Sequence, residues 1–191
     1  MCRWANLWRP GMDILEQLVS VAHKEGLSFL VIGGHAVIHH GYARTTDDLD
    51  FLIRQEDRRA WLAAVGTVGY MVLHDGGAFV QLKPPRPEEW PLDLMLVHGE
   101  TFGKLLAQAE PEQIETAAVL CPSLNHLFAL KLHALKHGHA RRVLKDMDDF
   151  VQLVQANQVN VKAASFRDLV EKYGNSEIYE RIVRICAEGQ S

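Results

Sequence analysis

The fold of this chain is decided by the stretch FLVIGGHAVIHHGYARTTDDLDFLI, residues 29–53. Its first four residues are apolar, which is typical of a strand covered on both faces. Gly33 and Gly34 come next, and because neither has a Cβ, the backbone there can turn tightly and approach another group closely. We expect residues 35–40 to form a short helix whose first N–H groups suit a phosphate.

A second strand is predicted over residues 48–53, and it carries two aspartates. Because side chains alternate across a strand, Asp48 and Asp50 share one face. Two carboxylates so close together require either that one is protonated or that a cation lies between them. Mg²⁺ is typically held by one or two carboxylates together with substrate phosphates. The stretch therefore indicates metal-assisted phosphoryl chemistry; the alternative is an exposed acidic turn before the strand.

These features at this spacing resemble the signature of the DNA polymerase β-like nucleotidyltransferase superfamily. The matching positions are two glycines, an arginine, a threonine and two aspartates: Gly33, Gly34, Arg44, Thr46, Asp48 and Asp50. Within the superfamily, the chain is similar to the small bacterial nucleotidyltransferase-like proteins, a group that includes AbiEii-type toxins and antibiotic nucleotidyltransferases. The resemblance covers residues 26–97 and, more weakly, 127–153. It departs from many members at His35, where they carry Ser or Thr.

The resemblance implies an α+β protein with an α/β-like core. In this nucleotidyltransferase fold a mixed, mostly antiparallel sheet is flanked by helices and followed by a C-terminal helical subdomain. We therefore expect residues 1–110 to form the nucleotidyltransferase core and residues 111–191 to form the helical subdomain. The apolar pattern is also interpreted as helical from residue 101 onward.

A further strand is predicted over residues 92–97, LDLMLV. Asp93, Met95 and Val97 point to one face of it, and the leucines point to the other. If this strand lies beside the one that carries Asp48 and Asp50, Asp93 completes a site of three carboxylates. The resemblance implies the same arrangement, with the third acidic residue acting on the metal ion at the acceptor side. The alternative is that Asp93 is an edge-strand or capping residue.

The resemblance also implies a set of nucleotide-binding residues: Gly33, Gly34, Arg44, Thr46 and Lys131. Lys131 is a cation on the apolar stripe of a helix predicted over residues 126–137, and in related proteins a lysine here often meets the phosphates. Three of these side chains also have simpler interpretations. Arg44 could neutralise a neighbouring aspartate, Thr46 could hold its own loop, and Lys131 could extend to solvent.

The composition argues against several classes of protein. A net charge of −4 is not that of a general nucleic-acid binder. No apolar run reaches the ~18 residues of a membrane span, and the first residues lack the apolar core of a signal peptide, so we expect a cytoplasmic protein. The three cysteines are widely spaced, which indicates neither a disulfide framework nor a zinc knuckle.

A basic, histidine-rich segment covers residues 133–145. His133 and His137 stand one helical turn apart with His139 beyond them, a spacing that can bind zinc. The glutamate of an H-E-x-x-H motif is missing, which favours solvated side chains. If the acceptor is an RNA, this segment is where phosphate contacts are expected.

We therefore expect a magnesium-dependent nucleotidyltransferase that moves a nucleoside monophosphate from an NTP to an acceptor hydroxyl on a small molecule, an RNA or a protein. Asp48 and Asp50 would hold two Mg²⁺ ions, for which Mn²⁺ is a substitute, and Asp93 would assist as the third catalytic carboxylate. Two alternatives remain. One is a toxin of a toxin–antitoxin system that acts on tRNA or protein by the same chemistry. The other is a non-catalytic binding module with the same fold.

Overall fold

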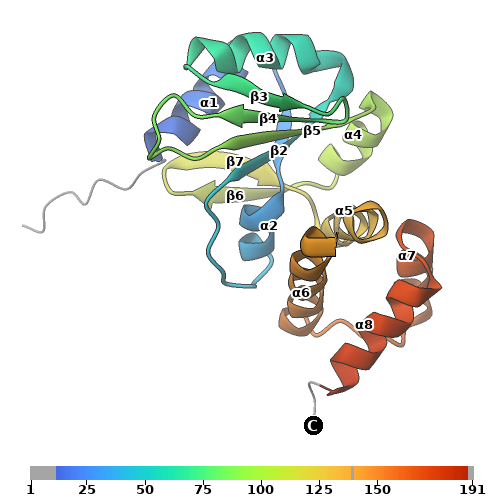
Figure 1. Cartoon of the computed structure of the whole chain (residues 1–191). Helices are drawn as coiled ribbons and strands as arrows, with labels where there is room; N and C mark the ends of the chain where they lie inside the picture. Colours follow the sequence, from blue (N-terminus) through green and yellow to red (C-terminus); the bar gives the residue numbers. More distant parts are fainter. Residues whose placement is uncertain (1–11, 139, 189–191) are drawn as a thin grey trace, which may run out of the picture. The chain divides into compact units, whose positions relative to one another are not determined.

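The computed structural model describes residues 12–138 and 140–188, and Figure 1 colours the chain by its sequence. The described residues fall into two units. The sheet unit contains residues 12–35 and 46–121, and the helical unit contains residues 36–45 and 122–188. The chain therefore leaves the sheet unit after His35, returns at Thr46, and leaves again after Cys121.

The sheet unit is built on one mixed sheet with the strand order β1-β2-β5-β4-β3. Its strands are β1 (Phe29–Val31), β2 (Leu49–Arg54), β3 (Met71–Asp75), β4 (Phe79–Lys83) and β5 (Leu92–Val97). The β2–β5 pair is parallel and the other three pairs are antiparallel. Two more strands, β6 (Glu110–Ile114) and β7 (Ala117–Cys121), form a separate hairpin. The predicted α+β fold, with a mixed sheet flanked by helices, is confirmed.

The helices of the sheet unit position its core. They are α1 (Met12–Lys24), α3 (Arg58–Thr67), which follows a short 3-10 turn (Gln55–Asp57), and α4 (Gly99–Leu106). Helices α1 and α3 pack against each other and lie on the same side of the sheet (Figure 1). On that side Trp61 of α3 is fully buried, and its ring lies edge-on to Phe29 and Phe51, at centroid distances of 5.5 and 5.9 Å. The α3 side of strands β1 and β2 is thus covered by aromatic side chains.

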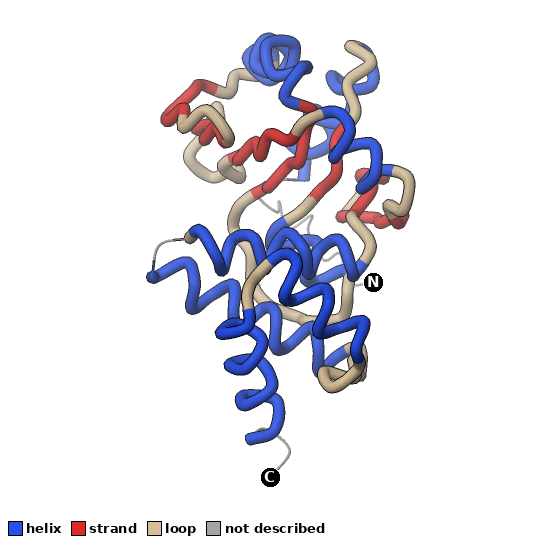
Figure 2. Tube along the Cα trace, turned by 90° about the vertical axis from the view of Figure 1, so that its right-hand side faces the viewer, coloured by secondary structure: helices blue, strands red, loops and turns tan. Residues whose placement is uncertain are grey.

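The helical unit contains helices but no strands among its described residues, as the blue and red colouring of Figure 2 shows. Its helices are α5 (Leu124–His137), α6 (Ala140–Ala156), α7 (Ala164–Tyr173) and α8 (Ser176–Glu188). Phe128, Phe150 and Phe166 come from three of these helices and form one aromatic cluster, with ring centroids 4.6 to 6.2 Å apart. The remaining helix, α2 (Gly33–His39), begins in the sheet unit and ends in the helical unit.

Two local expectations are corrected by the structure. Helix α2 begins at Gly33 rather than at residue 35, so both glycines belong to its first turn. The interpretation of the chain as helical from residue 101 onward is wrong for β6 and β7. The β6 sequence, EPEQI, is polar and contains a proline, so it shows no apolar alternation. The sheet unit extends through this hairpin to Cys121, beyond the predicted boundary at residue 110.

The described helices include none that is both long enough and apolar enough to cross a lipid bilayer.

Replacement of Trp61 by alanine should destabilise the sheet unit by about 3–5 kcal/mol, because a fully buried ring is lost and a cavity is left between α3 and the sheet. Urea-induced unfolding followed by circular dichroism measures this loss. Leu73→Ala is the matched control, since Leu73 on β3 is 72% exposed and should change stability by about 0.5 kcal/mol or less. Equal effects of the two substitutions would contradict this account of the core.

Candidate active site

Asp50 and Asp93 lie side by side on the two parallel strands at the centre of the sheet. They are directly paired in the register between β2 and β5, so their side chains leave the same face of the sheet. Both are partly exposed, whereas Leu49 and Phe51 on either side of Asp50 are fully buried on the opposite face. The structure therefore brings together two carboxylates that are 43 residues apart in the sequence (93 minus 50).

Asp48 precedes β2 by one residue and is also partly exposed. The Leu49 N–H donates a 2.9 Å hydrogen bond to the carbonyl oxygen of Pro91, which aligns this end of β2 with the start of β5. Alternation from Leu49 then puts the Asp48 side chain on the Asp50 side. The Thr46 hydroxyl donates a 2.8 Å hydrogen bond to Asp48 Oδ1. This hydrogen bond orients the Asp48 carboxylate, and the predicted contact of Thr46 with the nucleotide stays a prediction.

Gly33 is pressed against the Asp50 carboxylate. A Cβ at this position would lie 1.8 Å from Asp50 Oδ2, which is far shorter than any van der Waals contact. Gly33 also has a φ of +61°, in the left-handed region that favours glycine. The N–H of Ile32 donates a 2.9 Å hydrogen bond to the Asp50 carbonyl, which fixes the two segments to each other. The glycine pair and the carboxylates thus adjoin in space as they do in the motif.

Replacement of Gly33 by alanine should destabilise the protein by about 2 kcal/mol more than the same change at Gly26, because only Gly33 adds a steric clash to the backbone strain. Gly26 has a similar φ of +65° but open space around its Cα, so it isolates the cost of the backbone conformation. Both costs are measured by urea-induced unfolding.

The clash itself is tested by a double substitution. Truncation of the Asp50 carboxylate in Gly33→Ala/Asp50→Ala should recover part of the lost stability. Additive losses in the double variant would show that the Asp50 side chain is not what excludes a Cβ at Gly33.

Gln81 is a member of this site that the sequence analysis missed. It lies on β4 directly opposite Asp93, and its Nε2 donates a 3.3 Å hydrogen bond to Asp93 Oδ2. Nothing near Gln81 in the sequence marks it, and only the strand register brings it beside a catalytic candidate. His35, where many similar proteins have a hydroxyl, lies with its ring centroid 5.2 Å from that of Trp90.

Arg44 and Lys131 both belong to the helical unit, where they share a buried carboxylate. Asp149 of α6 is 1% exposed; its Oδ1 lies 2.9 Å from Arg44 Nε and its Oδ2 lies 2.5 Å from Lys131 Nζ. Lys131 Nζ also lies 2.7 Å from Asp146 Oδ1. Lys131 is therefore buried in a charge cluster rather than extended to solvent, and Arg44 pairs with Asp149 rather than with Asp47 or Asp48. Their contact with a nucleotide phosphate stays a prediction.

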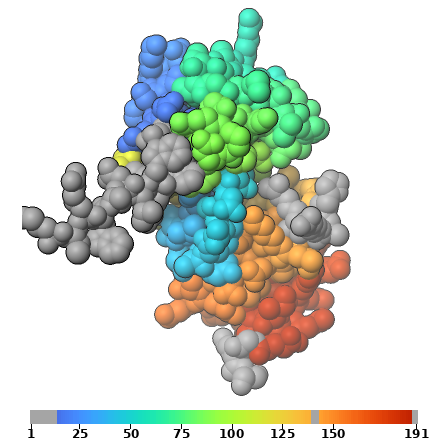
Figure 3. All heavy atoms as spheres, turned by 60° about the vertical axis from the view of Figure 1, so that its left-hand side comes forward, coloured from blue at the N-terminus to red at the C-terminus, as the bar shows by residue number. Residues whose placement is uncertain are grey.

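The segment around Arg44 is anchored to the helical unit at several points. The Tyr42 hydroxyl donates a 3.1 Å hydrogen bond to Asp148 Oδ2, and this bond is the main reason why the pKa of Tyr42 is raised. Asn157 Nδ2 donates to the carbonyl oxygen of His40 at 2.8 Å. Residues 41–45 of this segment are exposed or partly exposed, and they lie at the surface, in light blue in Figure 3. Two residues after Arg44 it reaches Thr46 and the carboxylate motif.

Removal of the shared carboxylate by Asp149→Ala should destabilise the protein by about 3–5 kcal/mol, because two buried cations lose a common partner. Asp148→Ala is the matched control, since Asp148 is exposed and accepts a hydrogen bond from the Tyr42 hydroxyl at the surface; its cost should stay below about 1 kcal/mol. Thermal unfolding of both variants provides the comparison. A loss at Asp149 no greater than that at Asp148 would mean that the cluster does not stabilise the helical unit.

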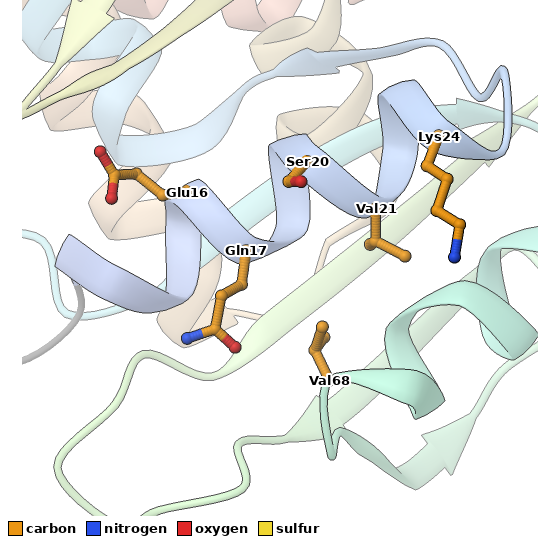
Figure 4. Close-up of a pocket in the computed structure, with 6 residues that line it drawn as sticks. All are labelled: Glu16, Gln17, Ser20, Val21, Lys24 and Val68. Carbon is orange, nitrogen blue, oxygen red and sulfur yellow. The ribbon is translucent and has the colours of Figure 1, made fainter.

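A separate hollow of about 480 Å³ lies beside helix α1 (Figure 4). It is lined by one side of α1 and by the residue that follows α3: Glu16, Gln17, Ser20, Val21, Lys24 and Val68. None of the predicted site residues lines it, so it is not part of the carboxylate site.

Two of the three histidines of the basic segment, His133 and His137, lie on helix α5. The rings of His133 and His137 are 4.6 Å apart, and both side chains are exposed. Partial burial and, to a lesser extent, the neighbouring His137 and Lys136 lower the pKa of His133. His139, the third histidine of the predicted set, lies outside the described residues.

Comparison with known proteins identifies the family of this chain. A family model described as "Uncharacterised nucleotidyltransferase" matches residues 12–189. The chain belongs to this nucleotidyltransferase family. The predicted enzyme class, nucleotidyltransferase, is therefore confirmed, and the family favours an enzyme over the non-catalytic module. The AbiEii-type subgroup is not supported by this match. No curated protein sequence matches the chain.

Solved structures of nucleotidyltransferases share the fold. ANT(2″)-Ia in complex with adenylyl-2″-tobramycin aligns with a TM-score of 0.59 and 18% identity over 82% of this chain and 96% of that one. A lincosamide antibiotic adenylyltransferase bound to lincomycin aligns with a TM-score of 0.53 and 14% identity, over 76% of this chain and 97% of that one. A putative nucleotidyltransferase from Thermotoga maritima aligns with a TM-score of 0.51 and 13% identity, over 72% of this chain and 92% of that one. At these identities the similarity shows the fold alone.

Proposed function

We propose that this nucleotidyltransferase transfers a nucleoside monophosphate from an NTP to an acceptor hydroxyl, with Mg²⁺ held by Asp48, Asp50 and Asp93. The observation that carries the proposal is the direct pairing of Asp50 with Asp93 on neighbouring parallel strands. Gly33 adjoins the same carboxylate and keeps the space beside it clear of side chains. Acidic groups and bare backbone thus converge at one face of the sheet.

The donor set fits a hard divalent cation. All three side chains offer carboxylate oxygens, the ligands that Mg²⁺ and Mn²⁺ prefer. Repulsion between the paired carboxylates also favours a cation beside them. When bound, such an ion would neutralise charge on the triphosphate and lower the pKa of the acceptor hydroxyl.

The backbone of Gly33 and Gly34 is proposed to approach the triphosphate, since two residues without side chains let phosphate oxygens reach backbone N–H groups. Thr46 contributes by holding Asp48 in place. Arg44 and Lys131 are retained as proposed phosphate contacts on the strength of the family resemblance. A phosphate at either cation has to compete with Asp149, to which both are already paired.

The reaction itself is a displacement at the α-phosphorus. The acceptor oxygen forms the new P–O bond, the bond from the α-phosphorus to the bridging oxygen breaks, and pyrophosphate leaves. Asp93 is proposed to accept the hydroxyl proton as a general base, with its carboxylate oriented by the hydrogen bond from Gln81. The remaining residues act by positioning charged groups, which is the main contribution of a protein to phosphoryl transfer.

Asp50→Asn should lower the rate of NMP transfer by about 10²-fold or more, because several kcal/mol of charge stabilisation are lost. The fold should persist, since asparagine has the same shape and relieves repulsion with Asp93. Mass spectrometry of products formed from the four NTPs with small-molecule and tRNA pools measures transfer, and thermal unfolding reports the fold. Asp168→Asn, on the exposed face of α7, is the control; near-full activity of Asp50→Asn would refute the assignment.

A toxin that acts on tRNA by the same chemistry is the second candidate. It is favoured by the exposed cations Lys136 and Lys145 on helices α5 and α6. Charge reversal at both positions should reduce labelling of tRNA strongly while labelling of a small molecule stays unchanged. Unchanged labelling of tRNA would remove the support for this candidate.

A further inference from the structure

The carboxylate face of the sheet continues past Asp93 to the sheet edge. Gln81 on β4 is paired with Asp93, and His74 on β3 is paired with Gln81 after a bulge in β3. Directly paired side chains leave the same face, so Asp50, Asp93, Gln81 and His74 form one row across four strands. This row leads from the proposed general base to the open edge of the sheet.

An aromatic and apolar surface lies beside this row. Phe79 is two residues from Gln81 on β4, so it shares the face, and it is paired with Met95 of β5. Its ring centroid is 5.4 Å from that of His74, and the side chain is 41% exposed. Met71, paired with Lys83 on the same face, is 60% exposed. Exposed apolar side chains next to a candidate catalytic group are a typical feature of ligand sites.

The Phe79 ring is held in position before any ligand binds. A Cβ on Gly76, in the hairpin turn between β3 and β4, would come within 2.6 Å of the ring. The Phe79 ring therefore packs against the Cα of Gly76 and also lies near the ring of His74. A side chain ordered in advance loses little conformational freedom on binding, which favours it as a stacking partner.

The charges of the hairpin select against a polycationic acceptor. Asp75 is the hairpin's acidic residue, but it is paired with the buried Val80 in the register and forms an ion pair with Arg58 of α3. Its carboxylate therefore lies on the opposite face of the sheet. On the carboxylate face the described side chains of β3 and β4 are neutral or cationic, with Lys83 exposed. A ligand with several ammonium groups that lies over β3 and β4 therefore finds no carboxylate on this face of these two strands.

We propose that Phe79, His74 and Met95 form the acceptor subsite, and that the acceptor is a neutral or anionic hydroxyl compound with a planar ring. This inference rests on the proposed function. The ring stacks on Phe79, and the row of Gln81 and Asp93 leads from that ring to the hydroxyl that receives the nucleotidyl group. Nucleosides belong to this class of compound, because a base supplies the planar ring and the ribose supplies the hydroxyl.

The first test supplies α-labelled ATP and Mg²⁺ together with four acceptors: adenosine and uridine as ring-bearing compounds, glycerol as a hydroxyl compound without a ring, and tobramycin as a polycation. Label should appear on the nucleosides in preference to the other two. Preferential labelling of tobramycin or glycerol, or failure to label either nucleoside, would overturn the proposal.

The second test measures the KM of the labelled nucleoside in variants of the hairpin. Phe79→Ala should raise this KM about 5- to 100-fold, the range expected for loss of one stacked base, and Phe79→Tyr should restore it. Val72→Ala is the matched control, since Val72 is 51% exposed on the same hairpin but is paired with the buried Leu82. An unchanged KM in Phe79→Ala would overturn the assignment.

Binding of Mg²⁺–ATP, measured by calorimetry, separates this inference from the proposed function. The affinity for Mg²⁺–ATP should be the same in Phe79→Ala and in the unaltered protein, and it should be lost in Asp50→Asn. Equal binding of Mg²⁺–ATP by Asp50→Asn would contradict the proposed function itself. Intact metal-dependent binding with no effect of Phe79→Ala on acceptor KM would contradict the acceptor subsite alone.

Discussion

The paired carboxylates of Asp50 and Asp93 are the constraint on which the rest of the sheet unit depends. Neighbouring strands lie about 5 Å apart, and two like charges at that spacing repel by about 3 kcal/mol at an effective dielectric constant of about 20. The parallel pairing of β2 with β5 imposes this proximity. Apolar packing on the opposite face, where Phe51 and Trp61 are fully buried, opposes the repulsion. A divalent cation would turn the same repulsion into a binding site.

The helical unit concentrates charge in a different way. Asp149 is almost completely buried, and it is acceptable there because Arg44 and Lys131 neutralise it from two directions. The segment from residue 36 to residue 45 is bound to this unit through His40, Tyr42 and Arg44. Because that segment leads directly into Thr46 and Asp48, the start of the carboxylate motif is covalently tied to a well-anchored stretch of chain. If Arg44 contacts a phosphate, its ion pair with Asp149 either stays in place or is broken by that contact.

The site as a whole follows the division of labour expected for nucleotidyl transfer, in which charge and position matter more than covalent chemistry. Thr46 donates a hydrogen bond to Asp48, and Gln81 donates one to Asp93, so each of these carboxylates is oriented by a neighbour. Gly33 provides bare backbone next to the Asp50 carboxylate. The hairpin of β3 and β4 then supplies what the motif lacks, a surface that distinguishes one acceptor from another. The fold shared with antibiotic adenylyltransferases does not specify that surface.

Local sequence patterns were sufficient to predict the strands around Asp50 and Asp93, the glycine turn that follows the first strand, and the face that each aspartate takes. They did not show that helix α2 already begins at Gly33. The predicted features follow from patterns within a few residues, because side-chain alternation and the conformational freedom of glycine are local properties. The motif was also sufficient to indicate a nucleotidyltransferase, but the predicted AbiEii-type subgroup is not supported by the family match. Contacts between residues far apart in the sequence became visible only in the tertiary structure. The pairing of Gln81 with Asp93 depends on strand register, and the ion pairs of Arg44 and Lys131 with Asp149 depend on the packing of the helical unit. No local pattern records such contacts, because their free energy is gained only when distant segments pack together.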